Sequence, residues 1–320
     1  MTLSRKISIA PMMACTDRHF RYLARLVTKH VLLYTEMLTP DAILHGDRER
    51  LLGYEPVESP LALQLGGSDP ALLAKAARVA EQWHYSEVNL NVGCPSDRVQ
   101  SGQFGACLMK QPQRVAECVE AMQEAVRIPV TVKSRIGVDD CDSYAELVHF
   151  VETISQAGCR SLTVHARKAW LQGLSPRQNR HVPPLRYDVV YQLKRDFPDM
   201  EIIINGGISD DAAVASHLAS VDGVMIGREA YRHLYWLSQF DQRYFNDDHP
   251  ILSRKQVLLR YLPYVSDQLA RGVPLRLFVK PMLGLFQGVS GAKSWRHFLC
   301  EQSRHPSGWR EIESKIKDMC

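Results

Sequence analysis

One cysteine of this chain stands where acid–base chemistry is possible. Cys94 lies in the run NLNVGCPS (89–96), where an apolar stretch gives way to asparagine, glycine and proline. A free thiol has a pKa of about 8.5, so at neutral pH it carries a proton that it can donate. The alternative is that Cys94, like most cysteines of a reducing compartment, is buried and inert.

The other cysteines do not form a recognisable site. They are Cys15, Cys107, Cys118, Cys141, Cys159, Cys300 and Cys320. No two of the eight cysteines are spaced as Cys-x-x-Cys, which argues against zinc ribbons, ferredoxin-type clusters and thioredoxin-like redox sites. We therefore expect no metal ion, and we expect most of the cysteines to be reduced, buried and inert.

A second group of residues could hold a phosphate. Asn205, Gly206 and Gly207 follow one apolar stretch, Gly227 and Arg228 follow the next, and the helical segment after the first of these turns begins near residue 209. Glycines let backbone N–H groups approach an anion, a helix amino terminus favours negative charge, and arginine adds a charged hydrogen bond. The plainer alternative is that the glycines only make tight turns.

A phosphate held there would place a flavin mononucleotide (FMN) with its ring near three further polar residues. Lys133 and His165 end two apolar stretches, and a cation beside the N1/O2 edge stabilises an anionic reduced flavin. The amide of Gln64 can bond the pyrimidine edge of the ring. Each residue also has a structural interpretation, as a strand-end lysine, a core histidine or a loop contact. The segment 11–13 (Pro11, Met12, Met13) could supply an apolar floor.

A repeating pattern of strands and helices could bring these residues together. Apolar, β-rich stretches recur at 7–12, 31–37, 61–65, 87–92, 130–134, 161–165, 201–205 and 223–226. Helix-like segments lie between most of them, such as 17–28, 70–83, 112–126, 143–157 and 210–218, with Asp17, Asp69, Ser143 and Ser209 as predicted caps. Eight such units predict an α/β fold of the (β/α)8 TIM-barrel type, whose active site lies at the carboxyl ends of the strands. A doubly wound sheet is the alternative, but no Gly-x-Gly-x-x-Gly follows the first strand.

The last part of the chain has a different character. Helix-like segments at 254–270, 275–285, 294–300 and 309–318 follow a polar stretch near residues 246–250. From residue 251 to 320 there are 12 Lys/Arg and 5 Asp/Glu, a net charge of +7, against −3 for the rest. We predict a catalytic barrel domain at 1–245 and a basic helical domain at 246–320 that meets an anionic partner. A merely solvated helical face is the alternative.

The bulk properties limit the class of protein. The chain has 320 residues, of which 45% are hydrophobic and 23% charged, as in ordinary globular proteins. No apolar run reaches the about 18 residues of a membrane span, and residues 1–6 lead directly into a strand-like segment. We expect a cytoplasmic monomer without a membrane partner.

Several of these segments resemble the tRNA-dihydrouridine synthases. They are IAPMM (9–13), LQLGG (63–67), NLNVGCPS (89–96), VKSRIG (132–137), TVHAR (163–167) and NGGI (205–208). The stretch HARKAWLQGLSP (165–176), with NR (179–180) and PPL (183–185), resembles the A-type bacterial subfamily. The resemblance extends over essentially the whole chain, including its basic helical end.

The resemblance implies a role for each matching residue. The family uses FMN, with NADPH as reductant, and reduces uridine in the D loop of tRNA; the A-type subfamily acts around nucleotides 20 and 20a. FMN contacts are expected at Pro11, Met12, Met13, Gln64, Lys133, His165, Asn205, Gly206, Gly207, Gly227 and Arg228. Contacts with the uracil are expected at Asn91 and Arg135, and contacts with the tRNA at Arg177, Arg180, Lys293 and Arg296. Lys293 stands where the subfamily more often has arginine; lysine neutralises a phosphate but cannot form a bidentate pair.

The implied reaction assigns Cys94 its chemistry. Hydride passes from flavin N5 to C6 of the uracil, and Cys94 supplies a proton to C5 from the opposite face. Two alternatives remain: an FMN barrel that acts on a small pyrimidine, as dihydroorotate or dihydropyrimidine dehydrogenases do, and a non-catalytic RNA-binding protein. The first does not explain the basic helical segment, and the second does not explain intact Cys94, Lys133 and His165.

Overall fold

The computed structural model describes residues 3–305 and 307–319, which form two compact units. The first, called here the barrel unit, comprises Met1–Met13, Leu32–Tyr54 and Ser59–Gly227. The second, the helical unit, comprises Ala14–Val31, Glu55–Glu58 and Arg228–Cys320. Most contacts of each unit are made within that unit, and the helical unit therefore includes two early segments as well as the end of the chain. The predicted functional division into residues 1–245 and 246–320 stays a prediction.

The described part of the barrel unit contains eight parallel strands that close on themselves. They are β1 (Ile7–Ile9), β2 (Leu33–Leu38), β3 (Leu61–Leu65), β4 (Glu87–Val92), β5 (Val130–Arg135), β6 (Ser161–His165), β7 (Glu201–Asn205) and β8 (Gly223–Ile226). Their order in the sheet is β1-β8-β7-β6-β5-β4-β3-β2. A parallel bridge between Ser8 and Leu32 joins the two ends, with Ile9 N donating to Leu32 O at 2.9 Å. The predicted (β/α)8 barrel is confirmed.

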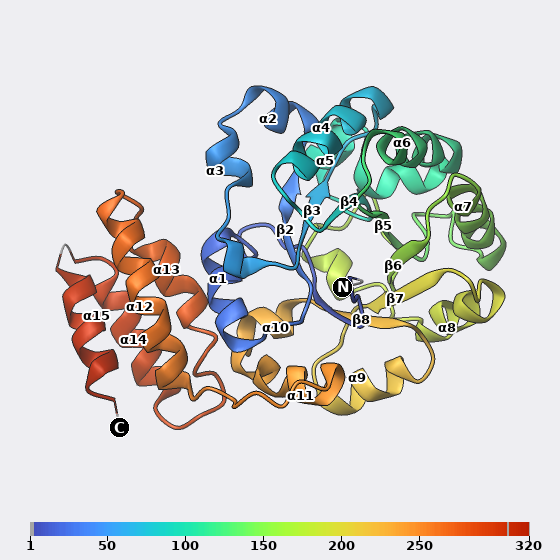
Figure 1. Cartoon of the computed structure of the whole chain (residues 1–320). Coiled ribbons are helices and arrows are strands. Elements are labelled where there is room, and N and C mark those ends of the chain that lie inside the picture. The colour runs from blue at the N-terminus through green and yellow to red at the C-terminus, as the bar shows by residue number, and fades with distance from the viewer. Residues whose placement is uncertain (1–2, 306, 320) are drawn as a thin grey trace. The chain divides into compact units, whose positions relative to one another are not determined.

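Helices surround this ring of strands (Figure 1). They are α2 (Pro40–His45), α3 (Arg48–Leu52), α4 (Pro70–Gln82), α5 (Asp97–Ser101), α6 (Pro112–Ala125), α7 (Tyr144–Gln156), α8 (Tyr187–Asp196) and α9 (Asp211–Leu218), with the 3-10 turns η2 (Gly105–Lys110) and η3 (Gln178–Arg180). Each long helix buries one apolar stripe, as Leu147, Phe150 and Ile154 of α7 do.

The helix starts follow side-chain capping, with one correction. Asp69 accepts from Leu72 N at 2.9 Å, and Ser143 forms a capping box with Glu146. Ser209 was predicted to cap the helix after β7, but the cap is Asp210, which accepts from Ala213 N at 2.8 Å. Two residues that can cap are adjacent here, and the extended backbone of Asp210 decides between them.

The barrel interior is partly polar. Residues of alternate strand positions point inward, and one apolar cluster there comprises Ala10, Leu32, Tyr34, Ala62, Ile203 and Met225. Glu87, at the start of β4, is completely buried and pairs with Arg5 at 2.5 Å, which also contacts Glu201 at 2.9 Å. An ion pair at the amino end of the barrel therefore closes the end opposite to the predicted site.

The helical unit comprises the predicted C-terminal helices and an early one. It contains α1 (Arg18–Val27), η1 (Pro56–Glu58), α10 (Arg228–Arg232), η4 (Leu234–Gln239), α11 (Phe240–Phe245), α12 (Arg254–Ala270), α13 (Arg276–Met282), α14 (Ala292–Gln302) and α15 (Gly308–Lys317). His19 of α1 donates to or accepts from the Tyr264 hydroxyl of α12 at 2.8 Å, and its ring packs on Phe278 of α13. Burial lowers the pKa of His19 to about 4, so this contact uses a neutral imidazole at pH 7. Asp17 caps α1, as predicted.

Two general features complete the fold. None of the helices in the described residues is both long and apolar enough to cross a lipid bilayer. The seven cysteines from Cys15 to Cys300 are free thiols, as predicted, but of these only Cys118 and Cys159 are buried, so the expected burial of most of them is wrong. Cys320 lies outside the described residues.

Candidate active site

The carboxyl ends of four adjacent strands bring the predicted site residues together. Strand register places Asn91 of β4 beside Lys133 of β5, and His165 of β6 beside Asn205 of β7. Arg135 is next to His165 across the β5–β6 pair. Parallel strands end at the same edge, so the barrel gathers these side chains at one mouth, as the sequence predicted.

The loop that carries Cys94 is held by Asn91. The amide oxygen of Asn91 accepts hydrogen bonds from Gly93 N at 3.1 Å and Cys94 N at 3.0 Å. The carbonyl of Cys94 accepts from Ala106 N at 2.9 Å, and its sulfur lies 3.5 Å from the Ser96 hydroxyl. Cys94 is half-buried, with its backbone fixed on both sides. This environment suits a thiol that meets a substrate in a defined position.

Arg135 ties the Cys94 loop to a second loop. Its guanidinium donates to Gly93 O at 2.8 Å, to Lys168 O at 3.0 Å and to Asn179 O at 3.2 Å. The side chain is 4% exposed. These three carbonyls bind guanidinium N–H groups of Arg135, the residue that the resemblance assigns to the uracil. The uracil contact stays a prediction.

Lys133 is a cation inside the mouth with a neutral partner. Its Nζ donates to the Asn205 amide oxygen at 3.2 Å, and Asn205 Nδ2 in turn donates to Met225 O at 2.7 Å. Desolvation lowers the pKa of Lys133 from 10.5 to about 7, and the positive charge of Arg135 adds to this shift. An anion bound beside Lys133 would reverse the effect, which makes this position suitable for a negatively charged ligand.

The desolvation of Lys133 makes stability depend on pH. Between about pH 7 and 10.5 the unfolded chain keeps the Lys133 proton and the folded protein loses it. The free energy of unfolding should therefore rise with pH in this window, by at most about 1 kcal/mol per pH unit because the side chain is partly exposed. Urea denaturation of the FMN-free protein at pH 7 and pH 9 checks this. In Lys133→Met that contribution should vanish, and an unchanged pH slope would contradict it.

The two glycines after β7 have backbone conformations that favour glycine. Gly206 has φ +118° and Gly207 has φ +72°. A Cβ on Gly206 would lie 2.6 Å from the ring of His165, and one on Gly207 would lie 2.5 Å from Leu185. The Tyr187 hydroxyl donates to Gly206 O at 2.7 Å, which holds this turn in place. The turn thus leaves no room for side chains beside His165.

The predicted phosphate grip involves the ends of β7 and β8. At the amino terminus of α9, the Asp210 carboxylate accepts from Ala213 N at 2.8 Å, and the phosphate contact stays a prediction. Gly227 ends the barrel unit, and the nearest atom to a Cβ there would be Ala10 Cβ at 4.0 Å, so the position is open. Arg228 belongs to the helical unit, where it begins α10.

Residues 11–13, which follow β1, and Gln64 are the other predicted flavin contacts in the barrel unit. Met12 packs on the apolar cluster of the interior, Pro11 is partly buried, and Met13 is 61% exposed. Gln64 is buried, with its amide between Asn89 and Asn91. The flavin contacts expected of these residues stay predictions.

A loop after β6 presents the two expected tRNA contacts of the barrel unit. Arg177 and Arg180 are exposed in and beside η3. Between them, Asn179 is completely buried: it accepts from Trp170 N at 2.8 Å and donates to Trp170 O at 2.9 Å. Asn179 therefore shapes the loop that displays the arginines. In the helical unit, Lys293 and Arg296 are exposed on α14.

The sequence-based site omitted a set of buried polar side chains. Glu87 and Asn89 of β4 and Thr131 of β5 are each at most 3% exposed and hydrogen-bonded to one another through Thr131. The alternation of Glu87 and Asn89 with valine and leucine along β4 was a signal in the sequence.

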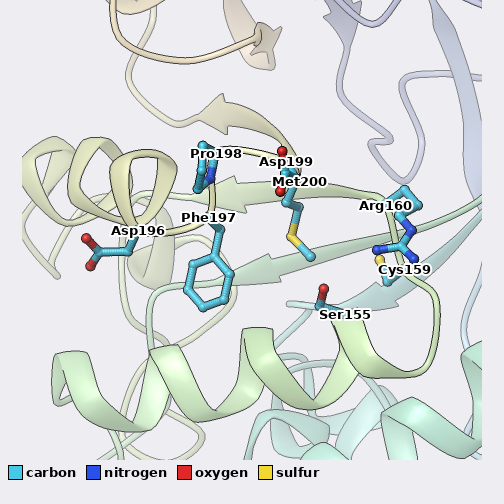
Figure 2. Close-up of a pocket in the computed structure, with 8 residues that line it drawn as sticks. All are labelled: Ser155, Cys159, Arg160, Asp196, Phe197, Pro198, Asp199 and Met200. Carbon is cyan, nitrogen blue, oxygen red and sulfur yellow. The ribbon is translucent and has the colours of Figure 1, made fainter.

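A cavity of about 210 Å³ lies elsewhere (Figure 2). Its lining includes Arg160 and Met200, which precede β6 and β7, so it opens at the amino ends of these strands. Asp196 in its wall accepts a hydrogen bond from the Tyr144 hydroxyl. Active sites of this fold lie at the other end, and the cavity has no part in the site.

Comparison with known proteins agrees with this geometry. A family model described as Dihydrouridine synthase (Dus) matches residues 8–319. The tRNA-dihydrouridine(20/20a) synthase of Synechocystis sp. is 56% identical over 306 residues, which cover 96% of this chain and 92% of the relative. The enzymes of that name from Pseudomonas aeruginosa and Vibrio parahaemolyticus are 56% and 52% identical, over 93% and 98% of this chain and 90% and 96% of their own.

A solved structure supports the fold independently. The chain is similar to one described as the crystal structure of TcOYE with pHBA, with a TM-score of 0.54 over 75% of this chain and 89% of that chain, at 12% identity. The sequence matches confirm the family and the oxidoreductase class that the motifs predicted. This chain belongs to the dihydrouridine synthase family.

Proposed function

We propose that this protein reduces uridine to 5,6-dihydrouridine in tRNA, around nucleotides 20 and 20a, with FMN as bound cofactor and NADPH as reductant. The observation that carries the proposal is the gathering of Cys94, Lys133 and His165 at one mouth of the barrel, beside a glycine turn without room for side chains. The names of the relatives, tRNA-dihydrouridine(20/20a) synthases, favour tRNA over a small pyrimidine as substrate.

The residues present fit FMN. Lys133 is a desolvated cation whose ammonium group contacts a neutral amide, and an anionic flavin edge would be its missing counter-charge. Gly206 and Gly207 allow the tight turn that packs against His165 at the end of β7, and Gly227 leaves open space at the end of β8. Arg228, Gln64, His165 and the segment Pro11, Met12, Met13 complete the proposed contacts.

Cys94 would act as the proton donor. Bound FMN, once reduced by NADPH, would supply a hydride to C6 of the uracil. The thiol of Cys94 gives its proton to C5, and solvent reloads it after the product leaves. Asn91 and Arg135 both hold the backbone beside Cys94, so the sulfur keeps one position relative to the base. The target base must leave its stack to reach this mouth.

The tRNA would be held mainly through its phosphates. Exposed cations on the η3 loop (Arg177, Arg180) and on α14 (Lys293, Arg296) are the proposed contacts. The +7 charge of residues 251–320 would strengthen this attraction.

Salt dependence tests the tRNA surface. The affinity for tRNA should fall steeply as the salt concentration rises. Replacing either Lys293 or Arg296 by alanine should lower the magnitude of the slope of the logarithm of the association constant against the logarithm of the salt concentration by about 1. Filter binding between low and moderate salt measures this. Arg114→Ala, which removes an exposed cation on α6 that pairs with Glu117, is the matched control and should keep the slope. A wild-type affinity that ignores salt would refute the proposed surface.

One assay decides between the substrate classes. NADPH oxidation is followed with unmodified tRNA and, separately, with free uridine, and dihydrouridine is quantified by mass spectrometry of the digested RNA. Turnover with tRNA alone supports the proposal. Equal turnover with both would favour an enzyme of small pyrimidines, and purified protein that neither contains nor takes up FMN would overturn both.

A further inference from the structure

A chain of hydrogen bonds crosses the barrel interior and ends at the loop of Cys94. Glu87 Oε1 accepts from the Thr131 hydroxyl at 2.6 Å, and Thr131 accepts from Asn89 Nδ2 at 2.9 Å. Asn89 Oδ1 accepts from Gln64 Nε2 at 2.8 Å, and Gln64 Oε1 accepts from Asn91 Nδ2 at 2.9 Å. Asn91 Oδ1 then accepts the backbone N–H groups of Gly93 and Cys94. All of these residues lie in the barrel unit.

The end at Cys94 fixes the direction of this chain. Backbone N–H groups can only donate, so the Asn91 side chain must turn its oxygen to Gly93 and Cys94. Its NH2 group then faces Gln64, whose oxygen must accept. The NH2 group of Gln64 in turn faces Asn89, and each amide thus determines the orientation of the next.

The end at Glu87 imposes the same direction. As the ion-pair partner of Arg5, Glu87 is a carboxylate, which offers lone pairs and no proton. The Thr131 hydroxyl must therefore donate to it, which leaves the Thr131 oxygen to accept from Asn89. The carboxylate acceptor at one end and the backbone donors at the other therefore require the same orientation of the four side chains between them. Each of these side chains has a hydrogen-bond partner on both sides.

We propose that Glu87 is a positioning residue for Cys94: the buried carboxylate orients the chain Thr131, Asn89, Gln64 and Asn91, and through it the backbone of Gly93 and Cys94. Glu87 touches neither substrate nor cofactor. The inference rests on the proposed role of Cys94 as proton donor, because a thiol that delivers a proton to one carbon needs one position.

A neutral amide at position 87 would require hydrogen-bond directions opposite to those that the backbone N–H groups of Gly93 and Cys94 require. In Glu87→Gln the side-chain oxygen is needed by Arg5, so the NH2 group would face Thr131. Thr131 would then donate to Asn89, and both following amides would have to reverse. Reversal would bring the Asn91 NH2 group against the N–H of Cys94, so one link must break.

Two matched pairs of variants test the proposal. Thr131→Val removes the hydroxyl at nearly constant shape, whereas Thr131→Ser keeps it. Glu87→Gln removes the orienting carboxylate, whereas Glu201→Gln removes the other carboxylate bound to Arg5, which lies outside the chain of amides. If Glu87→Gln does not fold, the threonine pair still carries the test.

The first measurement needs neither cofactor nor RNA. Hydrogen exchange is followed by mass spectrometry in a peptide covering residues 90–99. We expect at least about tenfold faster exchange of the Gly93 and Cys94 amides in Thr131→Val and Glu87→Gln, with wild-type rates in the two controls. Wild-type exchange in Thr131→Val would overturn the proposal, as would equal acceleration in Thr131→Ser.

The second measurement separates this inference from the proposed function. Flavin reduction by NADPH and flavin reoxidation by tRNA are measured in single turnovers. We expect Thr131→Val to keep the first rate and to slow the second at least about tenfold, with recovery in Thr131→Ser. A wild-type protein that does not reduce tRNA refutes the proposed function. If the wild type is active and Thr131→Val reoxidises at the wild-type rate, the function stands and the positioning role of Glu87 is overturned.

Discussion

Cys94→Ala is expected to accept electrons from NADPH at the wild-type rate but to form dihydrouridine at least about 10²-fold more slowly. The loop of Cys94 is held by backbone and Asn91 contacts that do not use the sulfur, so alanine should leave the loop in place. What the variant loses is the proton for C5, which water must then supply without positioning.

The measurement is a pre-steady-state experiment with two phases. Stopped-flow absorbance follows flavin reduction by NADPH, and a second mixing step with tRNA follows reoxidation. Cys141→Ala, which removes another partly exposed thiol of the barrel unit, is the control and should match the wild type in both phases. Wild-type reoxidation in Cys94→Ala would end the assignment of Cys94 as acid.

The scaffold of this site could be predicted because barrel strands are short apolar runs. The predicted bounds of β3, β4, β6, β7 and β8 are those of the structure. The first strand ends at Ile9 instead of residue 12, since Pro11 has no N–H to continue a ladder. Periodicity also placed the helices of the basic C-terminal segment within a few residues of their bounds.

The partners of the site residues could not be predicted in the same way. The sequence places Asn91, Lys133 and Arg135 at strand ends, but the acceptor for each depends on how distant loops fold. Arg135 binds carbonyls of residues 42, 33 and 44 positions away, which no local pattern indicates. Ser209 and Asp210 show the same limit at short range, because loop conformation selects the cap.

The polar interior face of β4 could have been recognised in the sequence, although the strand was assigned from its apolar residues alone. Glu87, Asn89 and Asn91 alternate with valine and leucine, so all three face the interior of the barrel. Only the last of them was expected to have a function. A buried carboxylate and two amides are costly inside a barrel unless they are fully paired, and their pairing leads to Cys94.

Lys133→Met should weaken the binding of reduced FMN by about 10²-fold, which corresponds to about 2.7 kcal/mol. Methionine keeps the length and apolar volume of the side chain but not its charge, so the loss reports electrostatics more than packing. Anaerobic titration of reduced FMN into apoprotein, followed by flavin absorbance, measures the dissociation constant. Lys110→Met removes a lysine that pairs with Asp139 on the barrel unit, and it should bind FMN like the wild type.

The pH dependence of the same titration identifies the cause. Since the pKa of Lys133 is lowered to about 7 in the free protein, and a bound anion raises it, binding must take up a proton above pH 7. Wild-type affinity for FMN should therefore fall as pH rises from 7 to 9, by at most about tenfold per pH unit. Lys133→Met should lack this component, so the two affinities should converge at high pH. A pH-independent difference between them would mean that Lys133 acts by shape, and the flavin charge would then need another counter-ion.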